Sequence, residues 1–322
     1  MNAPSKAAAV ILAGAGLVAA GLCGQAVPAK ALKGSLTLSG AWALYPMAVK
    51  WAEEFRKVQP GVRIDVQAGG AGKGMADALA GMADLGMVSR EVHPAEVAKG
   101  ALAFAVAKDG VVATVSSRNP HLAEIKKRGL TREKLAGIWI SGSVKTWGQA
   151  LGATGAVASS AIHVFTRSDA CGAADTWAAY LGQRQEDLGG VGVYGDPGLA
   201  DAVRRDPLAV GFNNVNFAYD PKTLRPIEGI AVVPIDLDGS GSIEPGEDVY
   251  ATRDDITGAI LKSVYPSPPA RDLYLVSRGR PASRPAAEFL RWVLTDGQRF
   301  VAETGFIPAG ADQVKEGLSK LK

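Results

Sequence analysis

Short apolar runs alternate with longer amphipathic segments along most of the chain. In the segment Pro46–Phe55, the residues Met47, Trp51 and Phe55 recur at steps of four and form one apolar face, which predicts a helix. The run Val62–Gln67 has the length and the flanking turn residues of a strand. Strand-like and helix-like segments then follow one another, which indicates α/β layers with largely parallel sheets.

The same hydrophobic pattern predicts boundaries for the other strands and helices. We predict strands at Leu36–Ser39, Val62–Gln67, Asp84–Ser89, Phe104–Val106, Val111–Val115, Ile162–Thr166, Val191–Tyr194, Ala209–Phe212, Ile230–Ile235 and Leu273–Ser277. We predict further helices at Gly74–Ala80, Arg132–Trp139, Ala173–Leu181, Leu199–Arg204, Arg253–Val264 and Pro285–Glu303. A chain of 322 residues corresponds to about two lobes.

The first 31 residues have the pattern of a secretory signal peptide. An apolar run from Ala7 to Cys23 follows Lys6, and the small-x-small sequence Ala29-Lys30-Ala31 follows that run. An uncleaved membrane anchor is the alternative, although the run is short for one. Lipidation at Cys23 is disfavoured because Leu22 stands where a lipoprotein signal has Gly or Ala. We therefore expect a periplasmic or secreted protein.

Composition and charge exclude several classes of protein. The hydrophobic share of 47% is too high for a disordered chain. Without residues 1–31 the chain loses Lys6 and Lys30, leaving 33 basic against 32 acidic residues, and no basic stripe for nucleic acid is visible. Cys171 is then the single cysteine, so no internal disulfide can form. We expect a monomer.

Three glycine-rich turns follow predicted strands and precede predicted helices. They are Ser39–Trp42, Gly69–Gly74 and Arg167–Ala173. Amide groups at the start of a helix favour an anion, so the three turns together suggest one oxyanion site that includes Arg167, although ordinary strand–helix turns have the same composition. The second turn is not a nucleotide-binding loop, because Gln67 stands where the first glycine is required and Gly74 follows Lys73.

A 12-residue calcium loop is the most specific local motif. Residues 236–247 carry acids at positions 1, 3 and 12, a hydroxyl at 5 and glycine at 6, which wraps hard oxygens around one ion. The predicted ligands are the side chains of Asp236, Asp238, Ser240, Glu244 and Glu247 and the carbonyl of Ser242. The preceding run Ile230–Ile235 predicts a strand, so we expect a single structural Ca2+ and not a paired regulatory site.

The three histidines are scattered and show no metal-binding spacing, which argues against zinc. Cys171 and His163 could be read as the nucleophile and base of a thiol enzyme. A position near a helix start would lower the pKa of the Cys171 thiol. His163, however, lies in an apolar strand pattern and is more often a packed residue.

At this point the order of motifs resembles the phosphate ABC-transporter substrate-binding proteins, over about residues 35–310. The motifs are, in chain order, Tyr45-Pro46, Lys50–Glu53, Gly69–Gly74, Ala83–Arg90, Leu130–Arg132, Trp139, Trp147, Arg167–Gly172 and Tyr265–Tyr274. The resemblance implies a two-lobed periplasmic binding protein-like fold of type II, in which each lobe is a mixed, mainly parallel sheet flanked by helices. Two hinge strands would join the lobes. The expected boundaries are 1–31 for the signal peptide, 32–112 and 265–322 for the first lobe, and 113–264 for the second lobe.

The resemblance also implies a role and a ligand site. Such a protein is not an enzyme; it captures an oxyanion and delivers it to an ABC permease at the inner membrane. The ligand residues carried over by position, together with Ser39 as a further donor, are Ser39, Ala41, Trp42, Ala43, Ala71, Gly72, Ser89, Arg167, Asp169, Cys171, Gly172 and Ala173. The family usually places Ser or Thr hydroxyls in these turns, so here we expect main-chain amides and Arg167 to dominate. Phosphate is the first candidate ligand. A calcium-stabilised exported binding or sensor module for another anion or small acid, and a thiol enzyme that uses Cys171, remain alternatives.

Overall fold

The structure is a computed structural model that describes Met1 and residues 32–322. The predicted signal peptide therefore lies outside the described residues. Its strands are β1 (Gly34–Gly40), β2 (Val62–Ala68), β3 (Leu85–Val88), β4 (Ala101–Ser116), β5 (His163–Arg167), β6 (Val191–Val193), β7 (Ala209–Asn214), β8 (Ile230–Val232), β9 (Ala270–Arg278) and β10 (Ile307–Pro308).

Helices connect most of these strands. The α-helices are α1 (Tyr45–Val58), α2 (Ala71–Ala80), α3 (Pro94–Ala98), α4 (Leu122–Arg128), α5 (Arg132–Trp139), α6 (Trp147–Leu151), α7 (Gly172–Tyr180), α8 (Gly195–Arg205), α9 (Val215–Ala218), α10 (Arg253–Leu261), α11 (Arg284–Val293) and α12 (Ala311–Lys320). Short 3-10 helices are η1 (Trp42–Leu44), η2 (Gly155–Val157), η3 (Gln185–Asp187) and η4 (Asp296–Phe300).

The strands form one mixed sheet and not a mainly parallel one. Their order is β2-β1-β3-β9-β4-β7-β5-β6, with β8 and β10 also paired to β4. The pairs β1–β2, β1–β3, β5–β6 and β5–β7 are parallel, whereas every described pairing of β4 and β9 is antiparallel. The sequence predicted the α/β class correctly but underestimated the antiparallel share, which the two long central strands supply.

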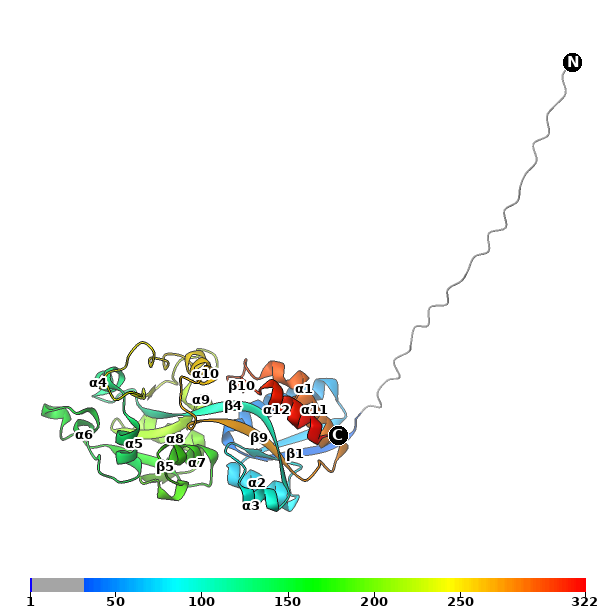
Figure 1. Ribbon diagram of the computed structural model, residues 1–322, viewed down its shortest axis with the longest axis horizontal. Coiled ribbons are helices and arrows are strands. Elements are labelled where there is room, and N and C mark those ends of the chain that lie inside the picture. The colour runs from blue at the N-terminus through cyan, green and yellow to red at the C-terminus, as the bar shows by residue number, and fades with distance from the viewer. Residues whose placement is uncertain (2–31) are drawn as a thin grey trace. The chain divides into compact units, whose positions relative to one another are not determined.

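The longest strand, β4, corrects another prediction. The sequence predicted two short strands here, Phe104–Val106 and Val111–Val115, but one strand is continuous from Ala101 to Ser116. Residues up to Gly110 pair with β9, and residues from Val111 onward pair with β7 and β8. Figure 1 shows β4 and β9 running side by side, with α5 to α8 beyond one end and α1, α11 and α12 beyond the other.

Two separate hydrophobic clusters form the core. One contains Leu36, Trp51 and Phe289 together with the first half of β4, and the other contains Trp139, Trp177 and the second half of β4. Each fully buried large apolar side chain contributes roughly 1.5–3 kcal/mol, so both clusters are substantial cores. They lie on either side of the point at which β4 changes partners.

One predicted helix is also shorter than expected. The apolar periodicity of Pro285–Glu303 suggested a single helix, but α11 ends at Val293 and η4 follows. Gly297 lies against Trp292, where an added Cβ would come within 3.1 Å of the Trp292 carbonyl oxygen, and its own carbonyl accepts a hydrogen bond from Trp51 Nε1. The α-helix therefore ends close to a glycine that is tightly packed against distant residues. Local periodicity of the sequence does not reveal such packing.

Candidate functional site

The first predicted turn lies at the carboxyl ends of the parallel strands β1 and β3. Gly40 has φ of +135°, and a Cβ on it would lie 2.3 Å from the Met87 carbonyl oxygen and 2.6 Å from Gly74 Cα. Only glycine permits this approach of three backbone segments. The first turn and the start of α2 are therefore in direct contact, at the edge where α/β sheets commonly bind ligands.

The second turn, which we call the glycine bend (residues 69–74), touches the third. The amide of Gly72 donates to the carbonyl of Ala170 over 3.1 Å. A Cβ on Gly70 would lie 2.8 Å from the same carbonyl oxygen and 3.1 Å from Asp169 Oδ2. The structure thus brings the glycine bend against the Arg167 loop (residues 167–173), although about one hundred residues separate them.

Ser89 closes the same cluster from the end of β3. It is buried, and a Cβ on Gly172 would lie 2.2 Å from its carbonyl oxygen and 2.3 Å from its Oγ. The first turn, the glycine bend, Ser89 and the Arg167 loop are therefore assembled in one place.

Arg167 is buried and paired twice. Its Nε and Nη2 donate to the two carboxylate oxygens of Asp169 over 2.8 and 2.6 Å, and its Nη1 donates to Asp196 Oδ2 over 2.7 Å. Burial works to lower the pKa of Arg167, but Asp196, Cys171 and Asp169 together raise it above its ordinary value. The guanidinium stays charged, and two of its five N–H groups remain for other acceptors.

The predicted amide donors fall into two groups. The amide of Ala41 donates to the Met87 carbonyl over 2.8 Å, and that of Gly72 is used by Ala170 as described. Ala71, Gly172 and Ala173 begin α2 and α7, where helix geometry leaves amides without an internal partner. Among the described residues no acceptor is found for these three amides.

The remaining residues of the first turn have other partners. The hydroxyl of Ser39 donates to Asp77 Oδ2 and accepts from Lys73 Nζ, so both of its partners are side chains of α2. The ring of Trp42 packs edge-on to Tyr194 with centroids 6.3 Å apart. Its Nε1 is buried without a partner in the described part of the chain. Ala43 is buried in the core beside it.

The surroundings of Cys171 argue against the alternative of a thiol enzyme. It is the N-cap of α7, and its Sγ accepts from the Ala174 amide over 3.4 Å. Burial raises the pKa of the thiol to about 12, which outweighs the lowering effect of Arg167. His163 is also not a packed core residue: it is exposed and pairs with Asp206. A buried neutral thiol is a poor nucleophile.

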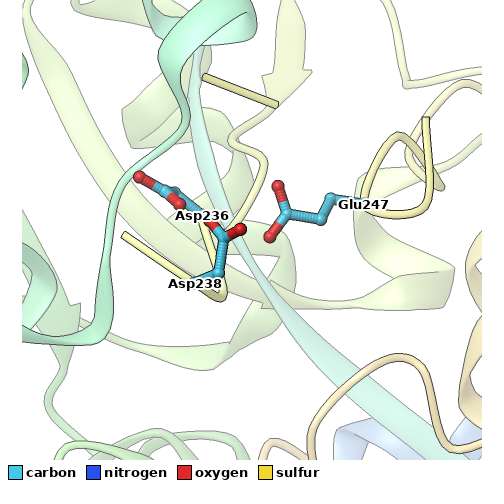
Figure 2. A group of neighbouring side chains, drawn as sticks. All are labelled: Asp236, Asp238 and Glu247. Atoms are coloured by element: carbon cyan, nitrogen blue, oxygen red, sulfur yellow. The ribbon is translucent and has the colours of Figure 1, made fainter. Parts of the chain in front are cut away.

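The predicted calcium loop, here called the acidic loop (residues 236–247), gathers three of its carboxylates. Oxygens of Asp236, Asp238 and Glu247 lie within 4.8 Å of one another, and this group could hold a metal ion. Figure 2 shows the Glu247 side chain reaching across the loop toward the two aspartates.

The other predicted ligands in the acidic loop do not belong to this group of three carboxylates. Ser240 Oγ donates to the Ser242 carbonyl over 2.9 Å, so the two lie together. Glu244 is exposed, and its side chain is not part of the group of three. Asp236 and Glu247 are buried and accept hydrogen bonds from backbone amides of the loop.

Three buried residues around Arg167 were not predicted. Asp196, Asn214 and Arg271 are all below 8% exposed and are linked to one another and to Arg167 by hydrogen bonds. The pair Asn213-Asn214 at the end of an apolar strand was a usable signal, because buried amides need partners. Asp196 and Arg271 carried no such signal in the sequence.

A cavity of about 590 Å³ opens beside this cluster. Its lining includes Glu91, Asp175 and Arg271, but none of the predicted anion residues. The described residues contain no helix that is both long enough and apolar enough to span a membrane.

Comparison with known proteins identifies the fold. A family model for the PBP superfamily domain matches residues 26–296. The phosphate-binding protein PstS of Pseudomonas aeruginosa is 26% identical over 91% of this chain and 88% of its own length. The phosphate-binding protein PstS 2 of Streptococcus agalactiae is 33% identical, but that match covers only 30% of this chain and 32% of the relative.

Solved structures agree on the architecture. A putative phosphate ABC transporter substrate-binding protein with bound phosphate from Clostridium perfringens has a TM-score of 0.69 at 21% identity, covering 86% of this chain and all of that one. An ABC-type phosphate transport receptor from Vibrio cholerae has a TM-score of 0.61 at 22% identity, with the same coverage of this chain. At these identities the likeness shows the mixed α/β fold.

Proposed function

Because the chain belongs to the PBP superfamily, we propose that it is a solute-binding protein that captures a small oxyanion, with phosphate as first candidate, for an ABC-type importer. The observation that carries this proposal is that the glycine bend and Ser89 both contact the Arg167 loop, which carries one buried guanidinium. The relatives named as phosphate-binding proteins support the choice of ligand. Its role is binding and not catalysis.

The anion would be held mainly by main-chain donors. The amides of Ala71, Gly172 and Ala173 stand at the starts of two helices, where the dipole favours negative charge. The free N–H groups of Arg167 would add charge-assisted hydrogen bonds. The predicted contacts of Ala41, Trp42, Ala43 and Cys171 would be secondary; the amide of Ala41 already has a partner, and the Cys171 amide donates to Gln185.

The charge around Arg167 favours an anion that keeps a proton. Two buried carboxylates, Asp169 and Asp196, face the single guanidinium of Arg167, so this group of three is not net positive. A fully ionised anion such as sulfate has only hydrogen-bond acceptors, so it cannot donate a hydrogen bond to either carboxylate. The hydroxyl of hydrogen phosphate can donate a hydrogen bond to a carboxylate oxygen, which would reduce the repulsion and give selectivity.

The ligand would lie between two lobes that close on it. We assign residues 32–112 and 265–322 to the first lobe and 113–264 to the second, with β4 and β9 as hinge strands. Most members of the two hydrophobic clusters on either side of the change of partners in β4 follow this division, which supports it. Closure of such lobes excludes water from the ligand.

Export, location in the cell and the membrane partner can be proposed as well. We propose that residues 1–31 direct export by the Sec route, that the mature protein works as a periplasmic or secreted monomer, and that its partner is an inner-membrane permease. The apolar run with the small-x-small sequence supports export.

We further propose that the acidic loop binds one structural Ca2+. Its three gathered carboxylates and the 12-residue spacing support this ion, with Ser240, the Ser242 carbonyl and Glu244 completing the oxygen set. The loop precedes α10 without a paired second loop in the described residues, so the ion would stabilise the fold and not act as a switch.

A ligand screen tests the main proposal. Purified mature protein would be heated with phosphate, sulfate, molybdate, tungstate or small carboxylates, and hits would be measured by calorimetry. Because a ligand bound only by the native state raises Tm, phosphate should give the largest shift and sulfate a smaller one. Equal responses to phosphate and sulfate, or none to any anion, would contradict the proposal.

A further inference from the structure

Arg271 lies beside the position at which β4 changes its pairing partner from β9 to β7. It lies on β9, directly opposite Asp109 in the antiparallel register, one pair before β9 and β4 separate. The next residues of β4, from Val111, pair with β7, where Asn214 faces Val111. The side chain is only 6% exposed.

The guanidinium of Arg271 joins three elements by its planar fork. Nη1 donates to the carbonyl of Gly172 over 3.0 Å, and Nη2 donates to Asn214 Oδ1. Gly172 is the first residue of α7 and Asn214 is the last of β7. One side chain from the hinge strand thus fixes the start of the helix that carries the predicted anion donors.

The contact with Gly172 acts on the next amide as well. The carbonyl of Gly172 and the N–H of Ala173 belong to one planar peptide unit and point in opposite directions. A hydrogen bond that orients the carbonyl therefore orients the Ala173 amide, and a positive donor also polarises it. Ala173 is one of the predicted anion contacts.

A second branch leads from Arg271 to Arg167. Asn214 Nδ2 donates to Asp196 Oδ1 over 2.7 Å, and Asp196 Oδ2 accepts from Arg167 Nη1 over 2.7 Å. Every side chain on this path is buried. Arg271 therefore contacts the start of α7 directly and is linked to Arg167 indirectly, through Asn214 and Asp196.

We propose that Arg271 is a positioning residue of the anion site, which holds the first turn of α7 and the Arg167 guanidinium in their binding geometry from the hinge strand. The inference rests on the proposed function. Arg271 does not need to touch the anion, because its effect passes through Gly172 and through Asn214 and Asp196. Loss of the fork lets the Ala173 amide and Arg167 reorient, and affinity for the anion falls.

Stability must be separated from positioning, because Arg271 also faces a buried acid. Asp109 Oδ2 lies 3.9 Å from Nη2, and neither carboxylate oxygen of Asp109 has a hydrogen-bond partner in the described residues. Arg271→Met alone would leave this carboxylate buried and unpaired, which destabilises a fold. The double variant Asp109→Asn/Arg271→Met removes both charges and should regain much of the lost Tm.

The experiment compares phosphate affinity and Tm across matched variants of the mature protein. Arg271→Lys keeps a charge opposite Asp109 but lacks the fork, so Tm should change little while Kd for phosphate rises about tenfold or more. The double variant should recover Tm but keep a similarly weakened Kd. Lys108→Met, next to Asp109 on β4 and at a side chain that is 38% exposed, should match the wild type in both measurements.

The outcomes separate the inference from the function on which it rests. If the wild type binds phosphate and the folded double variant binds it equally well, Arg271 is only a structural residue and the inference is wrong. If the wild type binds no anion of the panel, the proposed function itself is wrong and the inference falls with it. Weakened binding in both Arg271 variants, with Lys108→Met unchanged, supports the assignment.

Discussion

Arg167 is paired with two carboxylates of its own chain in addition to its proposed role in binding an anion. Asp169 and Asp196 take three of its five N–H groups, and all three side chains are almost fully enclosed. Removing the guanidinium would leave two buried carboxylates without their cation. The residue therefore supports the fold and the proposed site together.

We expect Arg167→Ala to abolish phosphate binding and to lower the free energy of unfolding by about 3–5 kcal/mol, because a broken buried ion pair leaves an uncompensated charge. Calorimetry at a temperature where circular dichroism shows a folded variant measures the first effect, and urea unfolding measures the second. Arg184→Ala is the control, since that arginine is exposed and its pairs contribute about 0–1 kcal/mol. A folded Arg167→Ala protein with wild-type affinity would remove Arg167 from the site.

Asp109 should make stability depend on pH. Burial raises its pKa to about 7, although Arg271 acts in the opposite direction. The native state therefore holds this proton more tightly than the unfolded chain, so the contribution is most favourable below about pH 4 and is lost as the pH rises to about 7. Between pH 5 and pH 8 the wild type should lose about 2–3 kcal/mol through this group.

Asp109→Asn removes that titration. Urea unfolding at pH 5 and pH 8 should show the variant gaining stability relative to the wild type at the higher pH, by about the same 2–3 kcal/mol. A constant difference between the two proteins across this range would mean that Asp109 does not titrate there. Asp248→Asn, at an exposed acid, serves as the reference.

Local chemistry made part of the site predictable from the sequence. Glycines at strand ends and Arg167 carry signals within a few residues, and the structure brings these turns together. Asp196 and Arg271 could not be found in this way. Their roles arise from partners that are 29 and 99 residues away in the chain, and such pairings exist only once the sheet has formed.

At the scale of elements, periodicity located most helices and strands but not their ends. The prediction divided β4 into Phe104–Val106 and Val111–Val115 and left out the residues between them, which include Asp109. The strand continues since Asp109 faces Arg271 on β9, a contact across more than 160 residues. The helix α12 was missed because it is largely polar, with Gly317 its sole fully buried residue.

The acidic loop is an element whose stability should depend on a metal. Three clustered carboxylates repel one another, and an ion bound only by the native state stabilises the fold by about 2.7 kcal/mol at one hundred times its Kd. We expect EDTA to lower Tm and added Ca2+ to restore it. Differential scanning calorimetry measures both shifts.

Variants of the loop make that test specific. Glu247→Gln, at position 12, should eliminate the response of Tm to Ca2+, because this residue supplies two of the oxygens in such loops. Asp248→Asn, the exposed neighbour outside the 12 residues, should respond like the wild type. An unchanged Tm on chelation of the wild-type protein would exclude the calcium proposal.

At the scale of the whole molecule, Trp42 offers a direct measure of closure. It extends from the first turn to Tyr194 and to Gly195 at the start of α8, where an added Cβ would lie 3.4 Å from its ring. The chain has six tryptophans, and the other five are at least 91% buried within the two hydrophobic clusters. Since Trp42 bridges the two proposed lobes, its surroundings change most when the lobes separate.

We therefore expect phosphate to change the intrinsic fluorescence of the wild-type protein, and Trp42→Phe to lose most of that change while remaining folded. A fluorescence titration gives the signal, and calorimetry on the same variant shows whether phosphate is still bound. Trp147→Phe, in the core of the second cluster, is the matched control and should keep the signal. If Trp42→Phe binds phosphate and shows the full wild-type change, the lobes do not close across Trp42, and the contact with Gly195 is a fixed part of the fold.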